Sequence, residues 1–373
     1  MKFIKSKLVL LIVACGLALL SKAACGNSSF CGVDSIDNSF SIILVGESHY
    51  SFGNDEIQFQ LFKELVTARK VNALLLECGM GSAYVINEYL DRGDRNLWFI
   101  EPYYTTDKNF LDSLRSFQQS LSPNDKFIVY GVDYEKNLSA LSWALQDILR
   151  DAKITDSISQ FSLRVRQPLT EFINDDNLEF KLRKKTLQSL DSLLYVFDNS
   201  SELFKKLLAA EYADFNALME NYRASKMLYG YNFEKSSSPL AIQREKLMYS
   251  NAIHIPKPIK LFGQFGILHV NLKEQEAWWN KRKKWYSFAA MLNNELDSPY
   301  RGKVCCIEMV YPYFEKRRAW KRTKTLGFTK IKLQQVFSTC QPGTWCIHCV
   351  KTSESEIFEN KFQYLIINRV TEK

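Results

Sequence analysis

The strongest constraint on the fold is an alternation of short apolar runs with amphipathic segments near the start of the chain. Three β-branched or leucine-rich runs are typical of buried strands, at residues 40–45, 71–76 and 127–130. Apolar residues recur at helical spacing between them, over segments that begin at Asn54 and that include 84–90 and 111–121. Strands that alternate with helices form right-handed βαβ units, so we expect an α/β fold with a mostly parallel sheet flanked by helices.

The pattern changes after the third predicted strand. Residues 151–250 contain one glycine, no cysteine and no histidine, and their apolar positions follow a helical period. Strands resume near 259–262, 304–310 and 362–370. We therefore expect a first part of the core at 38–136, a large helical insertion at 137–250, and a second part of the core with a cysteine-rich end at 251–373.

Residues 1–24 have the features of a signal peptide. A cationic start precedes an unbroken apolar run at 8–20, which is short for a membrane span. This segment holds four of the 49 basic residues and no acidic ones, so half of the formal net charge of +8 belongs to it. The remaining excess is small and shows no concentrated patch, and no nucleic-acid partner is expected.

Two cysteines near this segment bear on where the protein resides. Cys25 follows a full-length apolar run and precedes polar residues, whereas Cys15 has only a short apolar run before it. Lipidation at either cysteine would anchor the chain to a membrane without spanning it, and simple secretion is the alternative. The sequence predicts an exported protein, in the periplasm or held as a lipoprotein at the outer membrane or cell surface.

Seven further cysteines include five beyond residue 300. Cys346 and Cys349 form a CxxC pair that Cys305, Cys306 or Cys340 could complete as a zinc site. In an oxidising compartment one or two disulfides are the favoured interpretation. The basic and aromatic segment 278–286 predicts an amphipathic helix, with contact to a membrane surface, an anionic glycan or a nucleic acid as the alternatives.

Polar residues follow the predicted strands where each strand ends. The first strand runs into Glu47, Ser48 and His49, the second into Glu77 and the third into Asp133, while the strand after the insertion leads to Gln264 and His269. Ligands of open parallel sheets bind beyond the carboxyl ends of the strands. Three acids and two of the four histidines are thus predicted on one edge.

This set of residues supports three kinds of chemistry. A histidine beside a carboxylate can act as a general base on water. Two histidines and two carboxylates can instead hold a divalent metal, with Glu47, His49, Glu77 and His269 as its ligands. Ser48 as a nucleophile is disfavoured because it lacks the GxSxG elbow. The glycines at 263 and 266 do not form GxGxxG, so no dinucleotide site is predicted.

The ordered series of motifs resembles the erythromycin esterase-like proteins, which are grouped with the ChaN haem-uptake and Tiki/TraB proteins. Residues 46–49 are similar to the GEx(T/S)H signature, and Glu77 closes the second strand as in that family. Residues 130–133 resemble (F/Y)-G-(L/M)-D, 244–251 resemble R-(D/E)-x-x-M-x-x-N, and 263–269 stand in place of a late glycine–histidine segment. The resemblance covers about residues 40–275.

The resemblance implies an α/β core, an inserted helical region, a cleft between them and hydrolysis of an ester. His49 would be the general base, and Glu47, Glu77 and Arg244 would organise water, base and substrate. His269 would stabilise the oxyanion or bind substrate, with support from Asp133, Glu245 and Gln264. Gln264 stands where the esterases usually carry a histidine, which weakens the case for a macrolide substrate more than the case for the fold.

Two alternatives follow from the wider group. The motif Gly266–His269 fits the GxxH of Tiki-like enzymes, which implies a metal-dependent peptidase or hydrolase using the four residues named above. A ChaN-like surface lipoprotein that binds haem or another ligand without catalysis is the third hypothesis. No cofactor is favoured, a divalent metal is the alternative, and the expected substrate is a small molecule or a peptide.

Overall fold

The computed structural model describes residues 30–49, 54–93, 108–151, 180–229, 238–256, 259–277, 280–310, 345–350 and 361–368. Its centre is an eight-stranded sheet in the order β1-β9-β10-β8-β2-β5-β3-β4. All neighbours are parallel except β9 and β10, which are antiparallel. The predicted α/β class with a mostly parallel sheet is confirmed.

The strands of this sheet are short and largely buried. They are β1 (Phe30–Cys31), β2 (Ile42–Glu47), β3 (Ala73–Leu76), β4 (Ile128–Gly131), β5 (Leu261–Gly266), β8 (Val304–Val310), β9 (Trp345–Cys349) and β10 (Tyr364–Asn368). Two further strands, β6 (Gln275–Ala277) and β7 (Asn280–Trp285), form a separate antiparallel pair.

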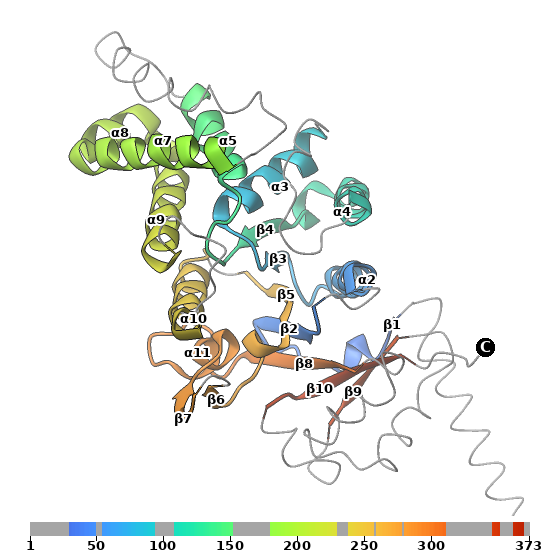
Figure 1. The fold of residues 1–373 in the computed structure, drawn as a ribbon. Coiled ribbons are helices and arrows are strands. Elements are labelled where there is room, and N and C mark those ends of the chain that lie inside the picture. Colours follow the sequence, from blue (N-terminus) through green and yellow to red (C-terminus); the bar gives the residue numbers. More distant parts are fainter. Residues whose placement is uncertain are drawn as a thin grey trace, which may run out of the picture.

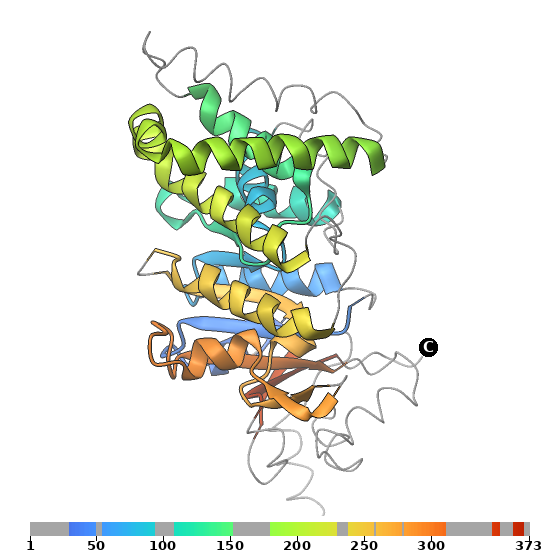
Figure 2. The same ribbon diagram turned by 60° about the vertical axis from the view of Figure 1, so that its left-hand side comes forward.

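Helices flank the sheet and extend beyond one end of it (Figures 1 and 2). The first group contains α2 (Asn54–Thr67), α3 (Met80–Arg92), α4 (Lys108–Ser120) and α5 (Leu138–Asp151). The second contains α7 (Phe180–Asn199), α8 (Ser201–Leu208), α9 (Tyr212–Tyr229), α10 (Ser238–Ile253) and α11 (Phe288–Asn294). Short 3-10 turns are η1 (Val33–Ser35), η3 (Pro123–Asp125), η4 (Ala209–Glu211) and η5 (Ile267–His269).

Alternation along the strands divides the apolar residues into two cores. In β2, Ile43 and Val45 belong to a core shared with α2, α3, α4 and α5, whereas Ile42 and Leu44 belong to a core shared with α10 and α11. Successive side chains of a strand point to opposite faces, so a strand covered on both faces is apolar at every position. Figure 2 shows α10 and α11 crossing one face of the sheet.

The chain between β4 and β5 is helical in the part that the structure describes, from α5 through α10. Phe197, Phe204 and Phe215 join α7, α8 and α9, with ring centroids 5.2–5.6 Å apart. None of the described helices is long and apolar enough to cross a membrane. The predicted signal peptide, with Cys15 and Cys25, lies outside the described residues, as does Cys340.

Some predictions of local structure were wrong. Part of segment 278–286 forms strand β7 and pairs with β6, in place of the amphipathic helix expected there. Strand β5 continues through Gly266, although the glycine-rich stretch that starts at Gly263 was expected to lie beyond its end. Both errors have one cause, because pairing with a neighbouring strand is a non-local effect that overrides local preference.

The zinc site that the sequence offered as the less favoured alternative at the C-terminal end does not form among the described residues. Cys305 and Cys306 are adjacent on β8, so their thiols lie in different cores, and burial raises the pKa of each. No group of three or more metal-binding side chains is arranged to hold an ion in these ranges. Cys31 and Cys346 are register partners on β1 and β9, and the predicted disulfides of this region remain a prediction.

The aromatic centre of the first core provides a test of the packing. Phe62 on α2 is fully buried and contacts the rings of Phe127 and Phe262 at centroid distances of 4.8 and 5.8 Å. We expect Phe62→Ala to lower the free energy of unfolding by about 3–5 kcal/mol, because it removes apolar contacts and leaves a cavity. Urea denaturation measures this. Met227→Ala, at an 81% exposed position, is the control and should change stability by less than about 0.5 kcal/mol. Equal effects of both changes would contradict the assignment of this core.

Candidate active site

The candidate site lies where the neighbouring strands β2, β5, β3 and β4 reach their carboxyl ends. Glu47 is the last residue of β2, Glu77 directly follows β3, and Asp133 lies two residues beyond β4. Gln264 comes from β5, His269 from η5, and the adjacent pair Arg244 and Glu245 from α10. Parallel strands end at one edge of the sheet, which is why residues far apart in sequence meet there.

His49 and Glu47 form the more exposed part of the site. The His49 Nδ1 atom lies 3.1 Å from Glu47 Oε1, and the two side chains are 34% and 6% exposed. Gln264 fixes the second oxygen of Glu47, because its Nε2 donates to Glu47 Oε2 at 2.5 Å and to the Asn54 carbonyl at 3.0 Å. A carboxylate held in this way favours the tautomer that carries its proton on Nδ1 and leaves Nε2 basic.

Gly266 makes room for this histidine. A Cβ atom at Gly266 would lie 2.3 Å from His49 Nε2, closer than real carbon contacts allow. The Gly266 N–H also donates to Glu77 Oε2 at 2.9 Å. A residue without a side chain is therefore needed for the strand end to support both groups.

Arg244 links two buried acids behind the histidine. Its Nη2 atom lies 2.6 Å from both Glu77 Oε1 and Asp133 Oδ2, and its Nε donates to Asp133 Oδ1 at 2.9 Å. Lys136 lies 3.8 Å from the same Asp133 carboxylate. A guanidinium held by two nitrogens on one carboxylate is a strong, oriented ion pair.

His269 lies between two carboxylates. Its Nδ1 atom is 2.5 Å from Glu245 Oε1, its Nε2 atom is 3.4 Å from Glu77 Oε1, and the side chain is 9% exposed. Glu245 is fixed in turn by the N–H of Phe288, which donates to its second oxygen at 2.6 Å. Both ring nitrogens therefore face acceptors, as in a protonated imidazolium.

Burial and charge act in opposite directions on this network. Burial lowers the pKa of His269, but Glu245 and Glu77 outweigh it and raise the pKa to about 10. Burial raises the pKa of Glu77, but His269 and Arg244 outweigh it and hold the pKa well below its usual value. Near neutral pH His269 is thus charged and cannot serve as a base.

The residues do not fit the proposed metal set of Glu47, His49, Glu77 and His269. Both oxygens of Glu77 are bound, one to Arg244 and the other to the Gly266 N–H. A positive guanidinium thus stands where a cation would have to bind, and Glu245 already occupies the Nδ1 atom of His269. The described residues contain no group of three or more His, Cys, Asp or Glu arranged to hold a metal.

All eight predicted site residues lie in one connected set, but some of their partners were not predicted. Asn54 links Gln264 to the segment of His49, because its Nδ2 donates to the Ser48 carbonyl at 3.0 Å. Asn221 and Asn251 bind the carbonyls of Asp133 and Val132, and so fix the end of β4. The sequence marked Asn54 only as the start of a helix. The hydrogen bonds that the backbone N–H groups of Gly266 and Phe288 donate could not be predicted, because they do not depend on the side chain.

Comparison with known structures shows that the fold of this chain is similar to that of an erythromycin esterase. An erythromycin esterase mutant in its open conformation matches over 90% of this chain and 92% of its own, with 13% identity and a TM-score of 0.52. A Bacillus cereus protein matches over 76% and 71%, with 15% identity and a TM-score of 0.50. A succinoglycan biosynthesis protein matches over 73% and 66%, with 17% identity and a TM-score of 0.50.

These likenesses concern the fold, since the identities are low. No protein-family model matches the sequence, and no curated protein matches it. The chain is an α/β protein with the fold of the erythromycin esterase-like structures. The fold implied by the sequence resemblance is confirmed.

The charge on His269 predicts a pH dependence of stability. Its pKa is higher in the folded protein than the ordinary 6.5, so its contribution is fully present below pH 6.5 and is lost as the pH rises through about 10. We expect urea denaturation to show a free energy of unfolding that falls over this window more steeply for the wild type than for His269→Gln. His254→Gln, at an exposed histidine bound to its own helix, is the control and should keep the wild-type slope. Parallel curves for the wild type and His269→Gln would contradict a charged, buried His269.

Proposed function

We propose that this protein is a hydrolase that uses His49 to activate water against an ester or a related bond. The observation that carries the proposal is the pair of His49 Nδ1 and Glu47 Oε1, 3.1 Å apart, at the rim of a buried ion network. The esterase named above shares the fold, which supports the reaction class but not the substrate.

The two histidines have different roles in this mechanism. His49 is about one-third exposed and is held by Glu47, so its Nε2 is the basic atom that meets water and substrate. His269 is buried and charged between Glu245 and Glu77. When two titratable groups of one site lie in different environments, their pKa values differ. Such a site can provide both a base and a cation at neutral pH.

The reaction then proceeds in two steps. His49 Nε2 accepts a proton from water while the water oxygen bonds to the carbonyl carbon of the ester. The tetrahedral intermediate collapses as the carbon–oxygen bond to the alcohol breaks, and His49 returns the proton to the departing alcohol oxygen. The products are a carboxylic acid and an alcohol, and the base is regenerated.

His269 supplies the positive charge that stabilises the intermediate. Its Nε2 lies 3.4 Å from Glu77, which is longer than a normal charge-assisted hydrogen bond, so this N–H can turn to a ligand oxygen. Arg244 lowers the pKa of Glu77 and holds the carboxylates of Glu77 and Asp133 in place. Glu245 and Gln264 position His269 and Glu47, respectively.

The substrate and location belong to the proposal as well. The substrate is a small molecule or a peptide, and a membrane contact through a lipid anchor follows from the residues at the N-terminus. Export to the periplasm or cell surface rests on the apolar run at 8–20 alone.

Replacement of the base tests the mechanism. We expect His49→Ala to lower kcat for the best substrate from a panel of esters by about a hundredfold or more, because the general base is lost. The matched control is His254→Ala, which removes an exposed histidine whose Nδ1 contacts the Ser250 carbonyl of its own helix. Its kcat should equal that of the wild type, and circular dichroism should show that both variants fold.

Full hydrolysis by His49→Ala would exclude this histidine as the base. Activity that requires an added divalent metal, and that a chelator abolishes reversibly, would favour the metal-dependent peptidase or hydrolase. A protein that hydrolyses nothing in the panel and gives a saturable absorbance change on haem titration would favour the binding-protein hypothesis.

A further inference from the structure

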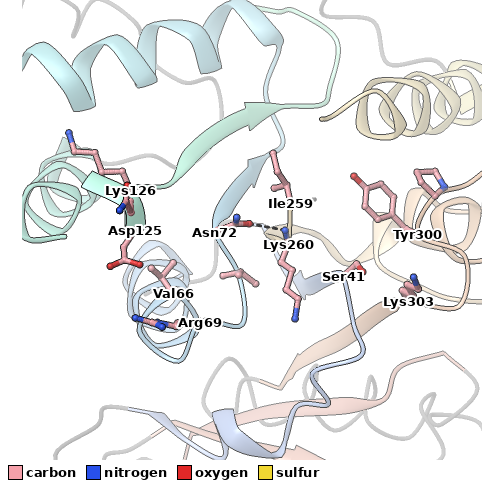
Figure 3. A pocket seen from close by; sticks show the side chains of 13 residues that line it. Ser41, Val66, Arg69, Asn72, Asp125, Lys126, Ile259, Lys260, Tyr300 and Lys303 are labelled. Atoms are coloured by element: carbon pink, nitrogen blue, oxygen red, sulfur yellow. Dashed lines mark hydrogen bonds between the residues drawn. The ribbon is translucent and has the colours of Figure 1, made fainter. Parts of the chain in front are cut away.

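The sheet edge opposite the candidate active site contains a cavity of about 650 Å³ (Figure 3). Four residues of its lining directly precede parallel strands: Ser41 before β2, Asn72 before β3, Lys260 before β5 and Lys303 before β8. The cavity therefore lies at the amino ends of β2, β3, β5 and β8. The candidate active site lies at the opposite, carboxyl ends of β2, β3 and β5, and β8 is the neighbour of β2. Its volume is in the range of small-molecule sites.

The backbone around this cavity is held by the sheet. The N–H groups of Ser41 and Ile42 donate to the Lys303 carbonyl at 2.9 and 3.2 Å. The Lys260 N–H donates to Asn72 Oδ1 at 2.8 Å, and the Asn72 N–H donates to the Lys260 carbonyl at 2.9 Å. Side chains on such a support project from fixed positions, which favours a preformed site.

The charge of the lining is strongly unbalanced. Arg69, Lys126, Lys260 and Lys303 line the cavity together with one acid, Asp125. Asp125 accepts a hydrogen bond from Ser122 at 2.7 Å, and the Lys260 ammonium donates to the Asn38 carbonyl at 3.1 Å. Within the described ranges none of the four cations forms an ion pair with a carboxylate. Grouped cations without counter-charges produce a positive potential that attracts anions.

Arg69 occupies a backbone position that suits glycine better. Its φ of 56° is left-handed, and it follows the end of α2, where its N–H donates to the Val66 carbonyl at 2.8 Å. The next N–H, of Lys70, donates to the Leu65 carbonyl at 2.9 Å. This is a helix-terminating motif in which glycine is the usual residue. The guanidinium at this point thus adds charge to the cavity without being needed to end the helix.

The remaining lining is apolar apart from Asn124. The apolar part consists of Val66, Val71, Ile259, Pro299 and Tyr300, of which Val66, Val71 and Tyr300 are buried. In Figure 3 Arg69 lies on the left of the cavity, Tyr300 on the right, and Ile259 between them. A ligand that fits both parts combines a multiply charged anionic group with an apolar or planar body. A phosphate group suits the anionic part, because it is compact, carries up to two charges and matches the fork of an arginine.

We propose that the cavity bounded by Arg69, Lys126, Lys260 and Lys303 binds a small organic phosphate. This site is separate from the candidate active site and does not depend on the proposed hydrolysis. The test is isothermal titration calorimetry of the full chain with inorganic pyrophosphate and with adenosine diphosphate, which adds a planar body to the same group.

We expect both probes to bind the wild type, with adenosine diphosphate the tighter. Arg69→Gly should weaken both about tenfold or more, while its melting temperature stays equal or rises, because glycine suits the left-handed backbone. Ile259→Ala should weaken adenosine diphosphate but not pyrophosphate. The control Lys206→Ala removes one exposed positive charge from α8, outside the cavity, and should leave both affinities unchanged.

Several results would overturn the proposal. These are binding of neither probe, wild-type affinity in Arg69→Gly, equal loss in Lys206→Ala, or sulfate binding as tightly as pyrophosphate at matched ionic strength. Binding to phosphatidylglycerol vesicles without binding to pyrophosphate would also overturn it, since the phosphate would then belong to a lipid surface. His49→Ala should bind both probes normally, so failure of the hydrolase proposal is distinguishable from failure of this one.

Discussion

The buried ion network around Glu77 is the interaction on which the rest of the candidate site depends. One carboxylate connects Arg244 of α10, the Gly266 N–H at the end of β5 and His269 of η5. Removing one partner of such a network leaves an uncompensated charge in a low-dielectric interior, which is strongly destabilising. The network therefore fixes α10 and the loop after β5 against β3, and with them the position of the reactive edge.

The difference in burial between the two histidines gives the site its chemical asymmetry. His49, about one-third exposed, is paired with the Glu47 carboxylate. His269 has two carboxylate neighbours and little exposure, which raises its pKa to about 10. The two histidines thus meet different environments at one edge of the sheet, and in His269 the neighbouring charges outweigh burial and favour the cation.

Much of the fold was predictable because its signals are local. Mostly apolar runs predicted β2, β3, β4 and β8, since strands that are largely buried need no regular polar side. β1 and the pairing of β9 with β10 were not predicted, because a short strand at an edge is defined by its neighbour and not by its own residues. The helix prediction for segment 278–286 was wrong for the same reason, because pairing with β6 makes part of this segment a strand.

The sequence by itself determined the class of the fold and placed the polar residues of the candidate site at one edge of the sheet. Parallel strands must end at one edge, so polar residues that follow them are brought together whatever the details of packing. Only the tertiary structure showed that His269 lies buried between two carboxylates and that the Arg244 guanidinium contacts Glu77 where a metal would have to bind. Both depend on burial and on contacts of about 3 Å between residues far apart in the sequence, such as Arg244 and Glu77, which are 167 positions apart. The tertiary structure alone also revealed the cationic cavity at the opposite edge, where residues with no shared motif meet because each precedes or flanks a strand of the same sheet.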